Sequence, residues 1–312
     1  MEQGNLTRVK EFILLGLTDI PELKTPLFWL FLVVFIITLL GNLSIIALVW
    51  FSPHLHTPMY ILLGNLSVLD LCYCCVITPN MLANFLSKRQ IISLSGCAAQ
   101  MFIFVMLGST EDFLLAVMAY DRYAAICHPL HYSSIITNRV CIYLVVGSYL
   151  GGLGNSVVQT TFTFMSTFCG PNQISHFLCD IPPLLNLSCS DTTPNEVALF
   201  IVAGAMVFGC LTLILVSYVR IIVTILMIRS SEGRRRTFST CSSHFICVTL
   251  FFGTVLFMYF RPSSKYALDQ DRVASLCYTV IIPMLNPLIY SLRNHQVKKT
   301  MLHHLRNTCV LK

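Results

Sequence analysis

Charged residues are scarce in this chain of 312 residues. Lysine, arginine, aspartate and glutamate make up 11% of it, and 55% of the residues are hydrophobic. Soluble globular proteins carry about 25% charged residues, so an ordinary soluble domain is excluded. The formal net charge is +6, but this excess does not indicate nucleic-acid binding, because the cations gather on one side of the expected topology.

Enzyme motifs are also lacking. Neither the zinc-binding pattern His-Glu-x-x-His nor the nucleophile pattern Gly-x-Ser-x-Gly occurs, so we expect neither an enzyme nor a cofactor. No internal repeat is evident, which argues against the duplicated halves of secondary transporters. The last apolar run contains no lysine for a Schiff base, which argues against a light-driven pigment. No apolar segment typical of a cleavable signal peptide precedes the first apolar run.

Seven long apolar runs dominate the chain. Each approaches the roughly 20 residues that a helix needs to cross the hydrocarbon core of a membrane. They extend approximately over Leu27–Phe51, Met59–Leu86, Ala98–Cys127, Val140–Met165, Val197–Ile228, Phe238–Phe260 and Val273–Leu292. We predict an all-α membrane protein, a single seven-transmembrane helix bundle over residues 1–312. Residues 1–25 form the N-terminus, 166–196 a long loop and 293–312 a tail.

The basic residues set the expected orientation, because short cytoplasmic loops carry an excess of lysine and arginine. With an extracellular N-terminus, twelve of the twenty basic residues and two acids lie inside, whereas eight basic residues and nine acids lie outside. We therefore expect a multi-pass protein of the cell membrane, in contact with lipids.

The cytoplasmic tail has Val297, Met301, Leu302 and Leu305 at helical spacing among cations, which predicts a short amphipathic helix; a disordered basic tail is the alternative.

Four of the fourteen cysteines fall on the expected outer side. An even number of cysteines in an oxidising compartment favours two disulfides, although four cysteines allow three connectivities. These residues are Cys97, Cys169, Cys179 and Cys189. The sequon at Asn5 lies on the same side and is the expected glycosylation site.

The segment Met118–Tyr123 places an acid, a base and two phenols at the inner end of the third run. Charges at a membrane helix end must meet water or pair with one another, and they often mark function. Asp121, Arg122 and Tyr123 would suit a polar latch that a cytoplasmic partner can reach. An interfacial anchor with Arg122 extended to lipid phosphates is the alternative.

Two acids lie deep in neighbouring runs. Asp70 is roughly 17 Å from the inner end of the second run, and Glu111 is roughly 16 Å above the inner end of the third, at 1.5 Å per residue. Two carboxylates at one depth cannot both stay charged without a cation or a proton. A sodium ion or a shared proton would resolve this, with Asn286 as a further partner; a neutral hydrogen-bonded network is the alternative. Asp112 points about 100° away from Glu111 around the helix.

The inner ends of the last two runs also carry distinctive residues. Pro283 and Pro287 interrupt the seventh run, which favours kinks, and Tyr290 follows them. The sixth run is preceded by the arginines 234–236 and a series of hydroxyl residues. That cluster suits docking to a partner, and a positive-inside anchor is the alternative.

The outer halves of the third, fifth and sixth runs offer an apolar pocket with few polar groups, which is typical of small-molecule sites. In the third run the side chains share a face because they are spaced i, i+3, i+4 and i+7. The candidate ligand-binding residues are Met101, Phe104, Val105, Gly108, Ser109, Val202, Met206, Phe252 and Tyr259. Ordinary helix packing is the alternative for each. No buried charge is evident, so the ligand is expected to be small, largely apolar and neutral.

Several long motifs together resemble the olfactory receptors of the tetrapod type, a branch of the rhodopsin-like G-protein-coupled receptors. The resemblance runs nearly from end to end. The motifs that carry it are, in order, Leu55–Tyr60, Asn65–Asp70, Met118–Cys127, Ser217–Tyr218, Phe238–His244 and Pro283–Tyr290.

The resemblance implies a receptor that binds a small volatile odorant, activates a stimulatory heterotrimeric G protein and raises cyclic AMP. It assigns coupling and activation to Asp121, Arg122, Tyr123, Tyr218, Arg236, Asn286, Pro287 and Tyr290. It implies that Asp70 and Glu111 form a sodium site, and it suggests disulfides Cys97–Cys179 and Cys169–Cys189, with Cys97–Cys189 still open.

Two departures from the family pattern stand out. The sixth run has Phe251-Phe252-Gly253 where the family often has Phe-Tyr-Gly, so a hydroxyl is missing there. Arg236 and Thr237 stand where a lysine is usual. A receptor of the same fold for a non-odorant small metabolite, expressed outside the olfactory epithelium, is the alternative function.

Overall fold

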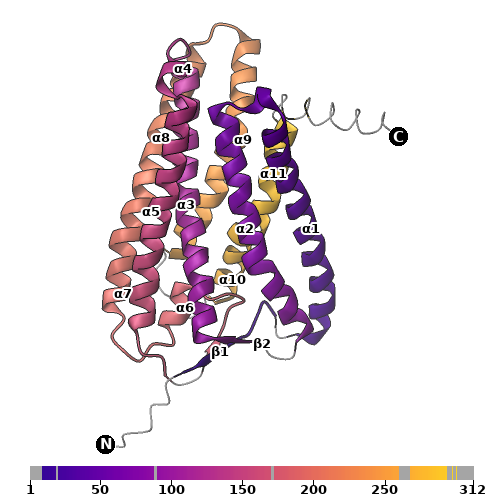
Figure 1. Cartoon of the computed structure of the whole chain (residues 1–312), viewed down its shortest axis with the longest axis vertical. Helices are drawn as coiled ribbons and strands as arrows, with labels where there is room; N and C mark the ends of the chain where they lie inside the picture. The colour runs from indigo at the N-terminus through magenta and orange to yellow at the C-terminus, as the bar shows by residue number, and fades with distance from the viewer. Residues whose placement is uncertain are drawn as a thin grey trace, which may run out of the picture.

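The chain folds into a bundle of long, nearly parallel helices (Figure 1). The computed structural model describes residues 9–18, 20–87, 90–169, 172–259, 268–293, 297 and 300. Within these residues, seven helical segments are long and apolar enough to cross a membrane. The predicted seven-transmembrane helix bundle is therefore confirmed.

Five of the spanning segments are continuous helices: α1 (Pro21–Phe51), α2 (Pro58–Leu86), α3 (Leu94–Cys127), α5 (Asn138–Met165) and α9 (Ser231–Tyr259). The first four end at the residues expected from the apolar runs. Helix α9 begins earlier than its apolar run, because it includes the polar segment with the arginines 234–236.

The fifth and seventh spans are composite. The fifth consists of α7 (Thr193–Ala198), the π-helical segment η2 (Leu199–Ala203) and α8 (Gly204–Met227). The seventh consists of α10 (Leu268–Leu276), the π-helical segment η3 (Cys277–Ile281) and α11 (Ile282–Arg293). Pro283 is the second residue of α11, just after η3. Because proline cannot donate a backbone hydrogen bond, the departure of this span from regular α-helix lies next to the expected proline.

Three short strands close one end of the bundle, which we call the sheet end (Figure 1). Strand β1 (Glu11–Leu14) is the central strand. It pairs antiparallel with β2 (Gln90–Ser93) and parallel with β3 (Gln173–Ile174). The N-terminal segment was expected only as an extracellular terminus, and the structure instead builds residues 11–14 into the sheet. The expected glycosylation site Asn5 lies outside the described residues.

Two disulfides hold the long loop at the sheet end. Cys97, in the first turn of α3, is bonded to Cys179, and Cys169 is bonded to Cys189. The pairing suggested by the family resemblance is confirmed. Between the disulfides, the short helix α6 (Ile181–Leu185) brings the loop into contact with the bundle. The loop and β1 together form a lid over this end.

The opposite end, which we call the arginine end, carries Arg122 together with the short 3₁₀-helix η1 (Pro53–Leu55) and the short helix α4 (Tyr132–Ile135).

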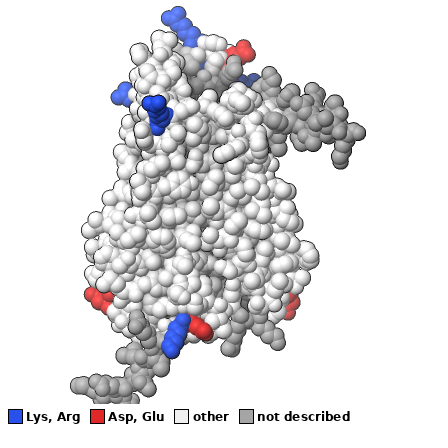
Figure 2. All heavy atoms as spheres, viewed as in Figure 1, with Lys and Arg blue, Asp and Glu red and all other residues white. Residues whose placement is uncertain are grey.

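On the face shown in Figure 2, charged side chains gather at the two ends, and the flank between them has none. Large apolar side chains such as Trp29, Leu40 and Leu226 are more than 60% exposed on the outside of the bundle. This distribution suits a multi-pass membrane protein. The predicted tail helix over 293–312 lies almost entirely outside the described residues.

Candidate functional site

A cavity of about 70 Å³ lies inside the bundle near the sheet end. Because one water molecule needs about 10–15 Å³ on this measure, the cavity has room for several waters or for a small organic molecule. Its walls come from α2, α3, α5, η2, α8, α9 and η3, and Ile181 of the lid also contributes. The two π-helical segments therefore both adjoin the cavity, and π-helical turns are frequent at functional sites.

The structure brings six of the nine predicted ligand-binding residues together on the cavity wall. The third run was expected to face the pocket with residues spaced i, i+3 and i+4, and α3 does so, although the contributing face continues one turn deeper, to Asp112. The six residues are Phe104, Val105, Gly108, Ser109, Met206 and Tyr259.

The other three predicted residues lie elsewhere, for different physical reasons. Met101 is fully buried, but it belongs to the apolar cluster under the lid that also contains Phe12, Cys97 and Cys179. Val202 lies in η2, whose π-helical turn leaves this side chain 36% exposed on the outside while Leu199 and Ala203 line the cavity. In α9 the neighbouring ring of Phe251 lines the cavity in place of Phe252.

One wall of the cavity carries a chain of polar side chains. The Asn155 side-chain amide on α5 donates to Ser109 Oγ on α3 at 2.8 Å. Gln159, one turn further along α5, donates to Asn155 Oδ1 and to the Ala198 carbonyl, each at 3.3 Å. All three side chains are buried. The wall formed by α3, α5 and the fifth span is therefore polar and internally bonded.

The end of the cavity next to the lid carries an acid that is fully bonded. Asp180 accepts hydrogen bonds from the Ile181 backbone N–H at 2.7 Å, from the Tyr259 hydroxyl at 3.0 Å and from the Tyr278 hydroxyl at 3.4 Å. Asp180 has no exposed surface. It ties the lid to α9 and η3. The sequence-based expectation of a site without buried charge is thus wrong, because Asp112 lines the cavity and Asp180 bonds to two of its tyrosines.

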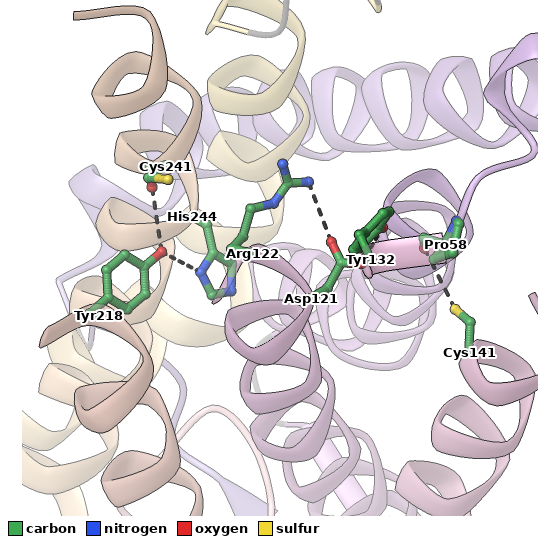
Figure 3. Close-up of polar contacts among 8 residues, drawn as sticks. All are labelled: Pro58, Asp121, Arg122, Tyr132, Cys141, Tyr218, Cys241 and His244. Carbon is green, nitrogen blue, oxygen red and sulfur yellow. Dashed lines mark hydrogen bonds and ion pairs between the residues drawn. The ribbon is translucent and has the colours of Figure 1, made fainter. Parts of the chain in front are cut away.

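At the arginine end, Asp121 joins two elements (Figure 3). Its carboxylate lies 3.9 Å from the Arg122 guanidinium and accepts a hydrogen bond of 2.7 Å from the Tyr132 hydroxyl of α4. Burial raises the pKa of Tyr132, and the bond to Asp121 raises it further, so the phenol keeps its proton and remains the donor. Tyr123, by contrast, bonds to His128 Nε2 at 3.1 Å.

A second polar pair lies on the other side of Arg122 in Figure 3. The Tyr218 hydroxyl on α8 lies 2.6 Å from His244 Nδ1 on α9 and also donates to the Cys241 carbonyl at 3.4 Å. The Tyr218 and His244 rings are stacked, with centroids 5.8 Å apart. Tyr218 therefore links α8 to α9 beside the arginine.

Comparison with known proteins gives one consistent result. The family model described as "Olfactory receptor" matches residues 31–308. Mouse "Olfactory receptor 5AP2" is 50% identical over 99% of this chain and 98% of its own length. Human "Olfactory receptor 5AR1" is 51% identical over 96% of both chains, and mouse "Olfactory receptor 5p57" is 53% identical over 96% of both.

The chain belongs to the olfactory receptor family. Members of this family are G-protein-coupled receptors that respond to small molecules, so the expectation that the chain is not an enzyme is confirmed. The resemblance inferred from the motifs is confirmed as well.

In this receptor, the membrane-depth acids form a third polar cluster. Asn286 of α11 donates to both carboxylate oxygens of Asp70, at 3.1 and 3.2 Å, and Glu111 of the neighbouring helix α3 is buried as well. Among the described residues, Glu111 Oε2 and Asn286 Oδ1 are buried oxygens without a hydrogen-bond partner. Oxygen ligands of this kind fit a hard cation.

Two of the remaining predicted activation residues, Pro287 and Tyr290, lie in the packed interior of the bundle. Pro287 packs closely against Gly41 of α1, and Tyr290 is buried. The side chain of Arg236 lies outside the described residues.

Sequence reasoning missed several residues of these clusters. Gln159, Asp180, Tyr278 and Tyr132 were not singled out, although buried polar side chains must find partners. Asn155 was also missed; it follows the glycines of the fourth run at helical spacing, and that spacing could have indicated a residue facing α3.

Proposed function

We propose that this olfactory receptor is activated by a small, largely apolar volatile molecule bound in the cavity, and that it activates a stimulatory heterotrimeric G protein and raises cyclic AMP. The observation that carries the proposal is a mainly apolar cavity of about 70 Å³ inside the bundle, whose other end bears the Asp121–Arg122 pair. Apolar walls with a few polar groups are typical of small-molecule sites.

The proposal places the sheet end outside the cell and the arginine end inside, next to the G protein. Two disulfides at the sheet end support this orientation, because disulfides persist in oxidising compartments. The excess of basic residues on the opposite side supports it as well. Epitope tags at the two termini of the receptor in intact cells test it: the N-terminal tag is expected to be accessible and the C-terminal tag only after permeabilisation. Accessibility of both tags in intact cells would contradict the topology.

Arg122→Ala tests the coupling role. The receptor is expressed with a stimulatory α subunit and exposed to a panel of volatile alcohols, aldehydes, ketones, esters and hydrocarbons. We expect Arg122→Ala to abolish the cyclic AMP response while the receptor remains at the cell surface. Arg139→Ala, which removes a charge from an exposed position at the same end, serves as the matched control and is expected to keep the response.

Two results would count against the proposal. A response of Arg122→Ala equal to that of the wild type would remove the coupling role of this arginine. If no compound of the panel raises cyclic AMP through wild-type receptor at the cell surface, the proposal of a volatile ligand and of coupling to a stimulatory G protein is wrong.

We also propose that Asp70, Glu111 and Asn286 hold a sodium ion in the inactive receptor. The two buried oxygens without hydrogen-bond partners among the described residues support this, because a cation between them would satisfy both and would offset the repulsion of the carboxylates. The ion would supply charge neutralisation only. The side chains bind it and link α2, α3 and α11.

A further inference from the structure

The two polar regions of the cavity differ in whether their groups are already bonded. Next to the lid, the hydroxyls of Tyr259 and Tyr278 both donate to Asp180. Deeper in the bundle, Asp112 lines the cavity with 4% of its surface exposed. Its Oδ1 atom has no hydrogen-bond partner among the described residues. Because buried polar atoms are nearly always bonded, Asp112 is the position where a polar group of the ligand is required.

Ser109 offers the complementary group one turn away on the same helix. Residues three apart on a helix lie on one face, about 4.5 Å apart along the axis at 1.5 Å per residue. Ser109 Oγ accepts from the Asn155 amide, and this is its only side-chain partner among the described residues. The serine hydroxyl proton therefore remains available as a donor toward the cavity that Ser109 lines.

A donor and an acceptor placed in this way match one functional group in particular. An alcohol hydroxyl accepts one hydrogen bond and donates another, so it satisfies Ser109 and Asp112 together. An ether, ester or aldehyde oxygen only accepts, and it leaves the carboxyl without a donor. An ammonium group only donates and leaves the serine proton unused. Asp112 keeps an acceptor oxygen in either protonation state.

The rest of the cavity suits an alkyl chain. Apolar side chains from three helices surround the space above the Ser109–Asp112 pair. They are Phe104, Val105, Met206, Val207, Phe251 and Val255.

We propose that the cavity selects small aliphatic alcohols, with the ligand hydroxyl accepting from Ser109 and donating to Asp112. This inference rests on the proposed function, because it assigns the ligand class of the same cavity. It also refines the expected neutral ligand by requiring a hydrogen-bond donor.

The test compares molecules with the same number of non-hydrogen atoms: hexan-1-ol, methyl pentyl ether, hexanal and hexan-1-amine. The measured quantity is the ratio of the half-maximal concentrations of the ether and the alcohol in the same cells, because this ratio cancels differences in expression and coupling. We expect a ratio of about ten or more in the wild type, since the ether leaves a buried acceptor unsatisfied.

Three variants separate the contributions. Asp112→Leu is expected to bring the ratio to about one, and Ser109→Ala to lower it. Asp112→Asn keeps an acceptor oxygen without the charge and is expected to preserve a preference for the alcohol. Asp191→Leu makes the same replacement at an exposed acid that does not line the cavity, and it is the matched control with an unchanged ratio.

Binding is measured separately from signalling by the thermal stabilisation of the purified receptor in detergent. Hexan-1-ol is expected to raise the apparent melting temperature more than methyl pentyl ether does in the wild type, and equally in Asp112→Leu. Equal stabilisation by both compounds in the wild type, a larger effect of the amine, or a preference that survives Asp112→Leu would overturn the alcohol inference. Preserved alcohol-selective binding without any cyclic AMP response would overturn the proposed signalling function and leave the inference standing.

Discussion

Replacement of Gly152 by alanine tests the packing of α5 against α3. A Cβ atom at this position would overlap Thr110 Oγ1, and it would lie 2.7 Å from the Met106 carbonyl oxygen and 2.9 Å from the Thr110 backbone nitrogen. Favourable contacts between non-bonded heavy atoms begin near 3.5 Å. The Thr110 hydroxyl donates to the Met106 carbonyl at 2.7 Å, so it cannot turn away without losing this bond. The backbone atoms can move only with α3.

The expected cost follows from two opposing contributions. Overpacking a close contact destabilises by about 1–3 kcal/mol, whereas alanine in place of glycine inside a helix stabilises by up to about 1 kcal/mol. At Gly147 and Gly154 of the same helix, an added Cβ atom would meet no described atom within 4 Å, so alanine there brings only the helix-propensity gain. The difference in stability between Gly152→Ala and Gly154→Ala therefore isolates the steric cost, which we expect near the upper end, about 2–3 kcal/mol.

Thermal unfolding of the purified receptor in detergent, followed with a thiol-reactive dye, measures this difference. The dye reports unfolding because several free thiols are buried in the folded state: Cys74, Cys141, Cys210, Cys241 and Cys247. We expect Gly152→Ala to unfold at a lower temperature than the wild type and Gly154→Ala at the same or a higher temperature. Separation of α3 from α5 would also lengthen the 2.8 Å bond from Asn155 to Ser109 and weaken the ligand response. Equal melting temperatures for the two alanine variants would refute the close-packing argument.

Two further predictions concern the polar clusters. Tyr132→Phe removes the 2.7 Å hydrogen bond to Asp121, and a bond to a charged group contributes about 1.5–3 kcal/mol. We expect basal cyclic AMP per surface receptor to rise, with Tyr143→Phe at an exposed position as the control. An unchanged basal level would show that Tyr132 does not help to hold the receptor inactive. Glu111→Ala should abolish the sodium dependence of ligand potency, measured with sodium replaced by a large organic cation, and an unchanged sodium titration would remove the ion site.

Periodic apolar patterning predicted the spanning helices well, because a membrane-spanning segment is selected mainly for length and apolarity. The ends at Phe51, Leu86, Cys127 and Met165 were predicted to the residue. The face of α3 was also predicted, since residues at i, i+3 and i+4 must lie together on any regular helix. The disulfide partners required more than spacing, and the family resemblance supplied them.

The misplaced ligand residues show where patterning stops being sufficient. The π-helical segment η2 changes the side-chain register, so Val202 faces outward although an α-helical pattern would turn it inward. Met101 has the correct helical face but lies too close to the lid, which includes strand β1. That strand pairs with residues about 80 and 160 positions away, and local patterning carries no information on such distant pairing.

Helices α3 and α9 both run from the cavity to the arginine end. Helix α3 contributes Asp112 to the cavity wall and Arg122 to the opposite end, ten residues or about 15 Å further along its axis. Helix α9 contributes Phe251 to the cavity and His244 to the pair with Tyr218, seven residues or about 10 Å apart. A ligand that shifts α9 relative to α3 therefore moves His244 relative to Arg122 as well. Coupling between two sites requires an element that both sites bias. Helix α9 contacts both, because it lines the cavity with Phe251 and holds Tyr218 of α8 through His244.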